Sequence, residues 1–222
     1  MVNSGKYWIA PSILNADQDN LEAEIDKVSQ VADLLHLDIM DNRFVPNITL
    51  GIDRARELIK SSNIKFDTHL MVERPEEIAP LYAAAGSYST TFHLEATEFP
   101  NETIKKISDY GSKVGIAIKP KTPIEELFPY LDKIDMALIM TVEPGFGGQS
   151  YISKMEEKIK ILRKYLDEAE LAKVKIEVDG GITESTIKRA ADAGAEVFVA
   201  GSAVYRGSNP AEAVERLRHI LL

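Results

Sequence analysis

The 222-residue chain contains no cysteine. This absence excludes disulfide bonds and cysteine-ligated metal sites, so any metal ion must be bound by His, Asp or Glu. It is also typical of a reducing compartment, and we expect a cytoplasmic protein. No stretch approaches about 18 consecutive apolar residues, and residues 1–8 lack the basic and apolar regions of a secretory signal. We therefore expect no transmembrane helix and no membrane partner.

Basic residues are outnumbered by acidic ones. The chain has 26 Lys and Arg residues against 35 Asp and Glu residues, a formal net charge of −9 and a sequence pI of about 5.1. Nucleic-acid-binding domains usually present a basic stripe, so we expect no nucleic-acid partner. The negative charge does not exclude a small phosphorylated ligand, because a few local N–H groups can hold an anion.

Short apolar runs rich in β-branched residues alternate with segments of helical spacing along the whole chain. Such continuous apolar runs are typical of parallel strands that are covered on both faces. Eight of these units follow one another without a linker or a break in composition, which predicts a single-domain (β/α)8 TIM barrel over residues 1–222. An open doubly wound sheet is the alternative. The expected strands are residues 8–14, 34–40, 65–72, 88–96, 114–119, 136–142, 175–179 and 197–200.

Helical spacing is clearest in residues 21–32 and 155–166. Pro123 and Pro210 stand where helices are expected to begin, and Thr183 is a candidate cap for the helix after the seventh strand. Three glycines follow helical segments, where a left-handed residue is common. They are Gly86, Gly111 and Gly194.

Ionisable side chains concentrate near the ends of three expected strands, which is the side where a barrel places its active site. Alternation along a strand puts the two such residues of each strand on one face. Buried charges cost several kcal/mol each unless they are paired or bound to metal, so we predict a divalent metal site formed by two His and two Asp. Zn²⁺, Fe²⁺, Mn²⁺ and Co²⁺ suit such ligands, and a hydrogen-bonded ion network is the alternative. The six ionisable residues near these three strand ends, from which the ligands would come, are His36, Asp38, Asp67, His69, Glu177 and Asp179.

Glycines follow the seventh and eighth expected strands. Gly180 and Gly181 lead toward a helix, and Gly201 precedes Ser202. Exposed backbone N–H groups favour an anion, and many barrels bind phosphate in these two loops, often with a short extra helix. Two tight turns would also use glycine, and this is the alternative.

A further glycine-rich loop follows the sixth expected strand and contains Gly145, Phe146, Gly147 and Gly148. We interpret it as a lid whose backbone can approach a ligand; an ordinary turn is the alternative. Methionines also lie at or near the ends of three strands, where their spacing alone indicates core filling. They are Met40, Met71 and Met140.

Taken together, these motifs are similar in sequence and order to those of the ribulose-phosphate 3-epimerase family and span nearly the whole chain. The matching segments are Ala10-Pro11-Ser12-Ile13-Leu14, His36-Leu37-Asp38-Ile39-Met40-Asp41, residues 43–49, His69-Leu70-Met71, residues 143–149, residues 177–181 and Val199-Ala200-Gly201-Ser202.

The resemblance implies one divalent metal ion bound by His36, Asp38, His69 and Asp179. It implies that Asp38 and Asp179 are also the acid–base pair, and that Ser12 and His69 contact the substrate. The glycine loops and Ser202 would close over the substrate and bind its phosphate, and the three methionines would surround the reacting carbons. It further implies a homo-oligomer that acts in carbohydrate metabolism, in the pentose phosphate pathway.

The sequence departs from the family pattern at three places. Asn42 stands where glycine is usual, and Asn tolerates a left-handed backbone. Asn15 replaces a usual small residue, and residues 87–89 replace a common Ala-Asp pair. We expect these changes to affect local loop geometry and to leave the chemistry intact.

The resulting hypothesis is metal-dependent interconversion of D-ribulose 5-phosphate and D-xylulose 5-phosphate, which differ only in configuration at C3. Two aspartates would exchange protons on opposite faces of C3, through a metal-stabilised enediolate. The nearest alternative is a 3-epimerase for a ketohexose 6-phosphate such as allulose 6-phosphate. A phosphate-binding barrel lyase or decarboxylase is less favoured, because Asp67-Thr68-His69 lacks the lysine such enzymes use. A binding module without catalytic activity is the third alternative.

Overall fold

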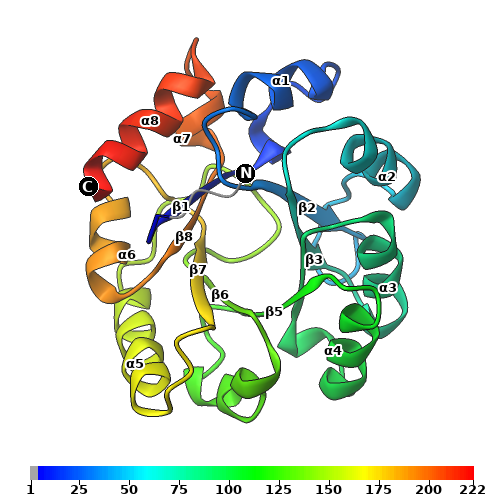
Figure 1. Ribbon diagram of the computed structural model, residues 1–222, viewed down its shortest axis with the longest axis vertical. Coiled ribbons are helices and arrows are strands. Elements are labelled where there is room, and N and C mark those ends of the chain that lie inside the picture. The colour runs from blue at the N-terminus through cyan, green and yellow to red at the C-terminus, as the bar shows by residue number, and fades with distance from the viewer. Residues whose placement is uncertain (1–4) are drawn as a thin grey trace.

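The computed structural model describes residues 5–222, so the first four residues of the segment searched for a secretory signal lie outside it. Within this range, parallel strands form a central ring and helices surround it (Figure 1). The strands are β1 (Trp8–Pro11), β2 (Leu35–Met40), β3 (Phe66–Met71), β4 (Ser89–His93), β5 (Lys113–Ile118), β6 (Met136–Met140), β7 (Lys175–Asp179) and β8 (Val197–Ala200).

The strand order closes the sheet into a barrel. Neighbouring strands pair in the order β1-β8-β7-β6-β5-β4-β3-β2, and every pairing is parallel. The remaining gap, between β1 and β2, is bridged by a parallel contact of Ser12 with His36. The predicted (β/α)8 barrel is therefore confirmed.

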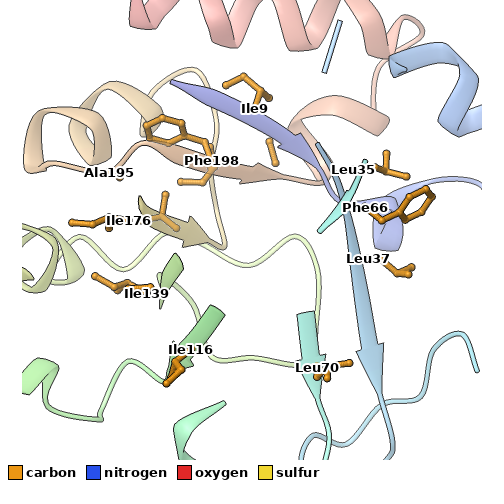
Figure 2. Close-up of a cluster of buried hydrophobic side chains, with 14 of the residues drawn as sticks. Ile9, Leu35, Leu37, Phe66, Leu70, Ile116, Ile139, Ile176, Ala195 and Phe198 are labelled. Atoms are coloured by element: carbon orange, nitrogen blue, oxygen red, sulfur yellow. The ribbon is translucent and has the colours of Figure 1, made fainter. Parts of the chain in front are cut away.

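Alternate residues of each strand face opposite sides of the ring. Leu35 and Leu37 of β2 and Phe66 and Leu70 of β3 belong to the apolar layer between strands and helices (Figure 2). Because side chains alternate with a period of two, His36 and Asp38 of β2 and Asp67 and His69 of β3 face the barrel interior. The strand register places His36 beside Asp67 and Asp38 beside His69.

Helices cover the outside of the ring and connect successive strands. No helix of residues 5–222 is long and apolar enough to cross a membrane. The α-helices are α1 (Leu21–Val28), α2 (Ile52–Ser61), α3 (Pro75–Ala85), α4 (Pro100–Ser108), α5 (Met155–Glu168), α6 (Ile187–Ala193), α7 (Ser202–Tyr205) and α8 (Pro210–Leu221). The 3₁₀ helices are η1 (Ile13–Asn15), η2 (Leu94–Ala96) and η3 (Ile124–Lys133).

Two strands, β1 and β4, end three residues earlier than the sequence predicted. The first strand ends at Pro11, because the chain turns into η1 and the Ser12 hydroxyl accepts a hydrogen bond from the Leu14 N–H. The fourth strand ends at His93, where η2 begins. Apolar residues continue past both strand ends, so an apolar run overestimates strand length wherever a buried turn follows.

Several helix boundaries also differ from those expected. Helix α6 begins at Ile187 with Thr186 at its cap, so the prediction that Thr183 caps this helix was wrong. Thr183 belongs to the preceding turn, where its N–H donates to the Thr186 hydroxyl. The segment after Pro123 is 3₁₀ rather than α-helical, and α1 ends at Val28 instead of residue 32.

Other local predictions are confirmed. Pro210 begins α8, and the side chain of Asn209 accepts from the Glu212 N–H. Asn42 has a φ of 57°, so it occupies the left-handed region that the family usually fills with glycine. The three glycines after helical segments have positive φ angles as well, which are 108° at Gly86, 75° at Gly111 and 120° at Gly194.

Helix α5 offers a direct test of how the barrel is stabilised. We expect Leu162→Ala to lower the free energy of unfolding by about 2–5 kcal/mol, because Leu162 is fully buried and its loss leaves a cavity. The neighbouring Ile161 is 37% exposed on the same helix. Ile161→Ala is the matched control and should change stability by about 0.5 kcal/mol or less. Equal shifts of the two denaturant midpoints would contradict the assigned faces of α5.

Candidate functional site

Four of the ionisable side chains predicted from the sequence meet at the carboxyl end of the ring. Nε2 of His36 lies 3.5 Å from Oδ1 of Asp38 and 3.9 Å from Oδ2 of Asp179. Nδ1 of His69 lies 3.5 Å from the same Asp38 oxygen and 3.6 Å from the same Asp179 oxygen. One atom from each side chain thus lies within 4.8 Å of the others, so the four residues could hold a metal ion.

The nitrogens that face this point have no hydrogen-bond partner. Nε2 of His36 and Nδ1 of His69 are both buried, and neither finds an acceptor or a donor. On His36 the other nitrogen, Nδ1, lies 2.7 Å from Oδ2 of Asp67, so the ring N–H donates there and leaves the Nε2 lone pair free. Two imidazole lone pairs and two carboxylate oxygens at one point form a donor set that suits a divalent cation.

A second polar layer lies deeper in the barrel behind His36. Asp67 accepts a hydrogen bond from the Ser89 hydroxyl at 2.6 Å, in addition to the one from His36. Glu177 is fully buried, with an oxygen 3.9 Å from Nδ1 of His36, and neither of its carboxyl oxygens has a hydrogen-bond partner. Glu177 therefore faces the interior, as alternation with Asp179 predicted, but it lies behind the four-residue group.

A chain of hydrogen bonds also lies behind His69. Nε2 of His69 is 2.9 Å from Nε2 of His93, and Nδ1 of His93 is 3.2 Å from Oε2 of Glu95. His93 is the last residue of β4 and is fully buried, whereas the Glu95 side chain is 21% exposed. Each histidine of the group is thus linked to a carboxylate on the side facing away from the common point.

The electrostatics of the group follow from burial and from close opposite charges. Burial by itself lowers the pKa of His36, but the carboxylates of Asp38 and Asp67 outweigh it and raise this pKa well above the usual value. Burial would raise the pKa of Asp38, yet the two imidazoles lower it strongly. Burial and the negative charge of Asp67 raise the pKa of Glu177 well above its usual value. The inner layer therefore favours a neutral Glu177 beside an ionised Asp67.

A cavity opens beside the four-residue group. Asp38 and Asp179 border it, whereas His36 and His69 are completely buried behind them. The structure brings all the other residues of the predicted site to this cavity. These are Ser12, Met40, Met71, Met140, Gly145, Phe146, Gly147, Gly148, Gly180, Gly181, Gly201 and Ser202.

Ser12 connects the cavity wall to the ionisable group. Its hydroxyl donates a 2.6 Å hydrogen bond to Oδ2 of Asp38, while the other oxygen of Asp38 faces the two histidines. Ser12 is itself only 5% exposed and forms the bridge that closes the ring beside His36. The carboxylate of Asp38 is thereby fixed in one orientation.

Two glycines after β7 have conformations and surroundings that exclude a side chain. Gly180 and Gly181 have φ angles of 117° and 65°. A Cβ on Gly180 would lie 2.3 Å from a methyl group of Val142, and one on Gly181 would lie 2.4 Å from the backbone nitrogen of Tyr151. Glycine is required here for backbone geometry and for close packing. The short helix α7 follows β8 at the adjacent loop, where an extra helix was expected.

The loop after β6 lies against the cavity. Its Gly145 carbonyl accepts a hydrogen bond from the Asn47 side chain at 3.2 Å, and the Gln149 side chain donates to the Phe146 carbonyl at 2.9 Å. Phe146 is 54% exposed. One hydrogen bond therefore joins the loop to Asn47 and another is internal to the loop, while the Phe146 side chain is about half exposed.

The methionines are packed in the wall of the site. Met40 and Met71 cluster with Val45, and Met140 packs with Val142 and its neighbours. All three are at most 3% exposed, yet they border the cavity. They have the core role that their spacing indicated, and they also border the cavity.

Sequence reasoning missed three residues around the site. His93 and Glu95 were placed within an expected strand without a role, although the strand-end rule applied to the other histidines would have selected His93. The sequence marks Asn15 only as a departure from the family pattern. A Cβ on Gly147 would lie 2.8 Å from the Asn15 side-chain nitrogen, and one on Gly201 would lie 2.2 Å from its oxygen. Asn15 therefore lies between the two glycine loops.

The fold and this geometry define the class: a (β/α)8-barrel protein with a buried His–Asp group at the carboxyl end of its strands that could hold a divalent cation. The model of the ribulose-phosphate 3-epimerase family matches residues 8–205. Proteins named ribulose-phosphate 3-epimerase are similar over nearly their whole length. The one from Mycobacterium leprae is 47% identical (95% of this chain, 93% of that protein), and the one from Bacillus subtilis is 40% identical (95% and 97%).

The chain belongs to the ribulose-phosphate 3-epimerase family. Similar solved structures include 3-keto-L-gulonate-6-phosphate decarboxylase from Vibrio cholerae, with a TM-score of 0.72, 14% identity and 98% of both chains covered. Orotidine 5'-phosphate decarboxylase from Pyrococcus horikoshii has a TM-score of 0.70 at 16% identity, with 96% of this chain and 98% of that chain covered. At such identities the likeness shows the barrel fold alone.

The environment of Glu95 predicts a pH-dependent contribution to stability. Burial would raise the pKa of Glu95, but hydrogen bonds from His93 and Thr122 lower it from 4.5 to about 2. Its folded-state pKa is therefore below its unfolded value, so its contribution is present above about pH 4.5 and is lost as the pH falls toward 2. We expect Glu95→Gln to be less stable than the parent protein at pH 7, with the difference shrinking over that range. Urea unfolding at a series of pH values measures the difference in the free energy of unfolding between the two proteins. A difference that does not change with pH would contradict the lowered pKa of Glu95.

Proposed function

We propose that this protein interconverts D-ribulose 5-phosphate and D-xylulose 5-phosphate by epimerisation at C3. The observation that carries the proposal is the placement of Asp38 and Asp179 on strands β2 and β7, both bordering one cavity beside the buried histidines. Membership of the epimerase family and the names of the relatives support the substrate.

The reaction needs two groups that exchange protons on opposite faces of C3. In one direction, a carboxylate oxygen of Asp38 takes the C3 proton, and Asp179 in its protonated form delivers a proton to the other face. An enediolate exists between the two steps, and the roles reverse for the other epimer. A single base would tend to return the proton to the face from which it came, so two carboxylates are needed. General acid–base catalysis of this kind typically contributes about 10²–10⁴-fold.

A divalent cation held by His36, Asp38, His69 and Asp179 would supply Lewis-acid stabilisation of the negative charge that proton removal places on the substrate oxygens. The partnerless nitrogens of the two histidines support such a site. Ser12 orients Asp38 through its 2.6 Å hydrogen bond. Imidazole and carboxylate ligands accept several divalent ions, so Zn²⁺, Fe²⁺, Mn²⁺ and Co²⁺ all remain candidates.

In this proposal the glycine loops bind the phosphate end of the substrate and close over it. Backbone N–H groups near Gly180, Gly181, Gly201 and Ser202 would bind the phosphate and fix the position of C3. The loop containing Gly145, Phe146, Gly147 and Gly148 would close over the substrate and exclude water, which protects the enediolate from losing phosphate. The three buried methionines would provide a smooth apolar wall against the flat intermediate.

The family favours the pentulose phosphate over the alternatives. A ketohexose 6-phosphate such as allulose 6-phosphate would undergo the same chemistry and needs only a longer pocket. The structural neighbours include decarboxylases, but their likeness extends to the fold alone, and the end of β3 carries Asp67-Thr68-His69 without a lysine. Rates measured with both ketose phosphates distinguish the two epimerase activities. A module that merely binds sugar phosphate would exchange no C3 proton.

We also propose a cytoplasmic homo-oligomer. A relative from Oryza sativa, 42% identical over 95% of this chain and 92% of that protein, is named as a cytoplasmic isoform. The absence of cysteine agrees with a reducing compartment. Sedimentation of the purified protein tests the oligomeric state.

The two-base scheme predicts the behaviour of aspartate variants. Asp38→Asn and Asp179→Asn should each lower kcat by at least about 10²–10⁴-fold, because each variant lacks one of the proton-transfer groups. Circular dichroism should show an intact fold. Asp135→Asn, placed before β6 at the opposite end of the barrel, is the matched control and should retain activity. Near-native turnover by either active-site variant would refute the scheme. Solvent deuterium should enter C3 during turnover by the parent protein.

Metal dependence gives an independent prediction. Purified protein should contain about one divalent ion per chain, and treatment with a chelator should abolish epimerase activity. Adding back a single metal should restore it, with the restored rate depending on which ion is used. Elemental analysis and the epimerase assay, before and after chelation, provide both measurements. Full activity in metal-free protein would refute the metal site and favour the alternative, in which the His–Asp group is a hydrogen-bonded ion network.

A further inference from the structure

We propose that His93 and Glu95 form a relay that positions the proposed metal ligand His69. The inference rests on the proposed metal site and concerns residues outside it. His93 neither borders the cavity nor belongs to the four-residue group, and it ends a strand from which no ligand comes. The only hydrogen-bond partners of its side chain in residues 5–222 are His69 and Glu95.

The distances define one consistent direction for the protons. Nδ1 of His69 faces the common point and must keep its lone pair to bind a cation, so the ring proton lies on Nε2. This N–H donates to Nε2 of His93 at 2.9 Å. The remaining proton of a neutral His93 is then on Nδ1, where it donates to Oε2 of Glu95 at 3.2 Å. Every nitrogen of both rings has one role in this arrangement.

The outer end of the relay is fixed to the loop after β5. The other oxygen of Glu95, Oε1, accepts a 2.7 Å hydrogen bond from the Lys119 N–H and a hydrogen bond from the Thr122 hydroxyl. Phe44 lies against the His93 ring, with 4.9 Å between ring centroids, and Lys119 lies over the Phe44 ring. The carboxylate and the imidazole are therefore both held in place before any ligand binds.

The relay matters because the other tautomer of His69, with its proton on Nδ1, could not bind a cation at the common point. Without an acceptor at His93, the buried Nε2–H of His69 would be unsatisfied, which costs about 1–3 kcal/mol. Moving the proton to Nδ1 would relieve that cost but would remove the lone pair from the common point. The partner of His36 is different: His36 donates directly to the buried carboxylate of Asp67. Histidine ligands in metal sites commonly have such outer partners, whose loss typically lowers metal affinity by about 10–100-fold.

The test compares two substitutions of His93 that differ in the ability to accept a hydrogen bond. His93→Gln can place an oxygen near the position of the imidazole Nε2, and His93→Phe fills the same space without an acceptor. Thr91→Val is the matched control, since Thr91 lies on the same strand, is fully buried and has a hydroxyl without a partner. The metal-free proteins are titrated with Co²⁺ in competition with a chelator, and the visible spectrum of the bound ion is recorded.

We expect His93→Phe to bind Co²⁺ about 10–100-fold more weakly than the parent protein and to change its ligand-field spectrum. His93→Gln should recover most of the affinity, and Thr91→Val should match the parent. Glu95→Gln should give a smaller loss than His93→Phe, because an amide oxygen still accepts from His93 without the negative charge. Thermal unfolding of each metal-free variant shows that the fold is retained. If His93→Phe does not fold, the Co²⁺ affinity of Glu95→Gln relative to Thr91→Val tests the relay.

Unchanged Co²⁺ affinity and spectrum in His93→Phe would overturn the relay. Equal losses in His93→Phe and His93→Gln would overturn it as well, because the effect would then follow ring packing rather than the hydrogen bond. If His93→Phe does not fold, unchanged Co²⁺ affinity in Glu95→Gln would refute it. Failure of the parent protein to bind Co²⁺ would refute the metal site itself, so the two failures are distinguishable.

Discussion

The rest of the structure depends on the burial of two imidazoles and two carboxylates around one point at the carboxyl end of the strand ring. Such groups are costly to remove from water unless each has a partner. Here each of the two histidines is linked to a carboxylate behind it, and Asp38 is held by Ser12. The imidazole nitrogens left without partners are those that face the common point. The unsatisfied imidazole nitrogens thus lie where a cation can use them.

On the same strands, one set of alternate residues packs in the hydrophobic layer and the other set forms the site. On β2, Leu35 and Leu37 belong to the apolar layer outside the ring (Figure 2). The alternate residues His36 and Asp38 face the interior. A shift of one residue in register would exchange the two sets and bury the charges among the helices. The hydrophobic layer outside the ring therefore specifies the register on which the geometry of the site depends.

The structural neighbours show what the fold alone does not decide. Two decarboxylases share this barrel with TM-scores of 0.70 and 0.72, yet they are only 16% and 14% identical in sequence. A 3-hexulose-6-phosphate synthase shares it with a TM-score of 0.70 at 18% identity. A barrel offers the same strand ends to many reactions, and the side chains placed there determine the chemistry. In this chain, those side chains include His69 on β3, with His93 of β4 hydrogen-bonded behind it, and Asp179 at the end of β7.

The sequence by itself determined the eight units, the face of each strand and the left-handed turn at Asn42, because these depend on near neighbours in the chain. It also selected six ionisable residues near strand ends, since alternation and strand ends are local properties, and the family resemblance singled out the four that meet at one point. Only the tertiary structure decided where the first and fourth strands stop, that His93 contacts His69, and that Asn15 lies between two glycine loops. The physical reason is that such contacts join residues far apart in the chain. They exist only after the ring has closed in one register.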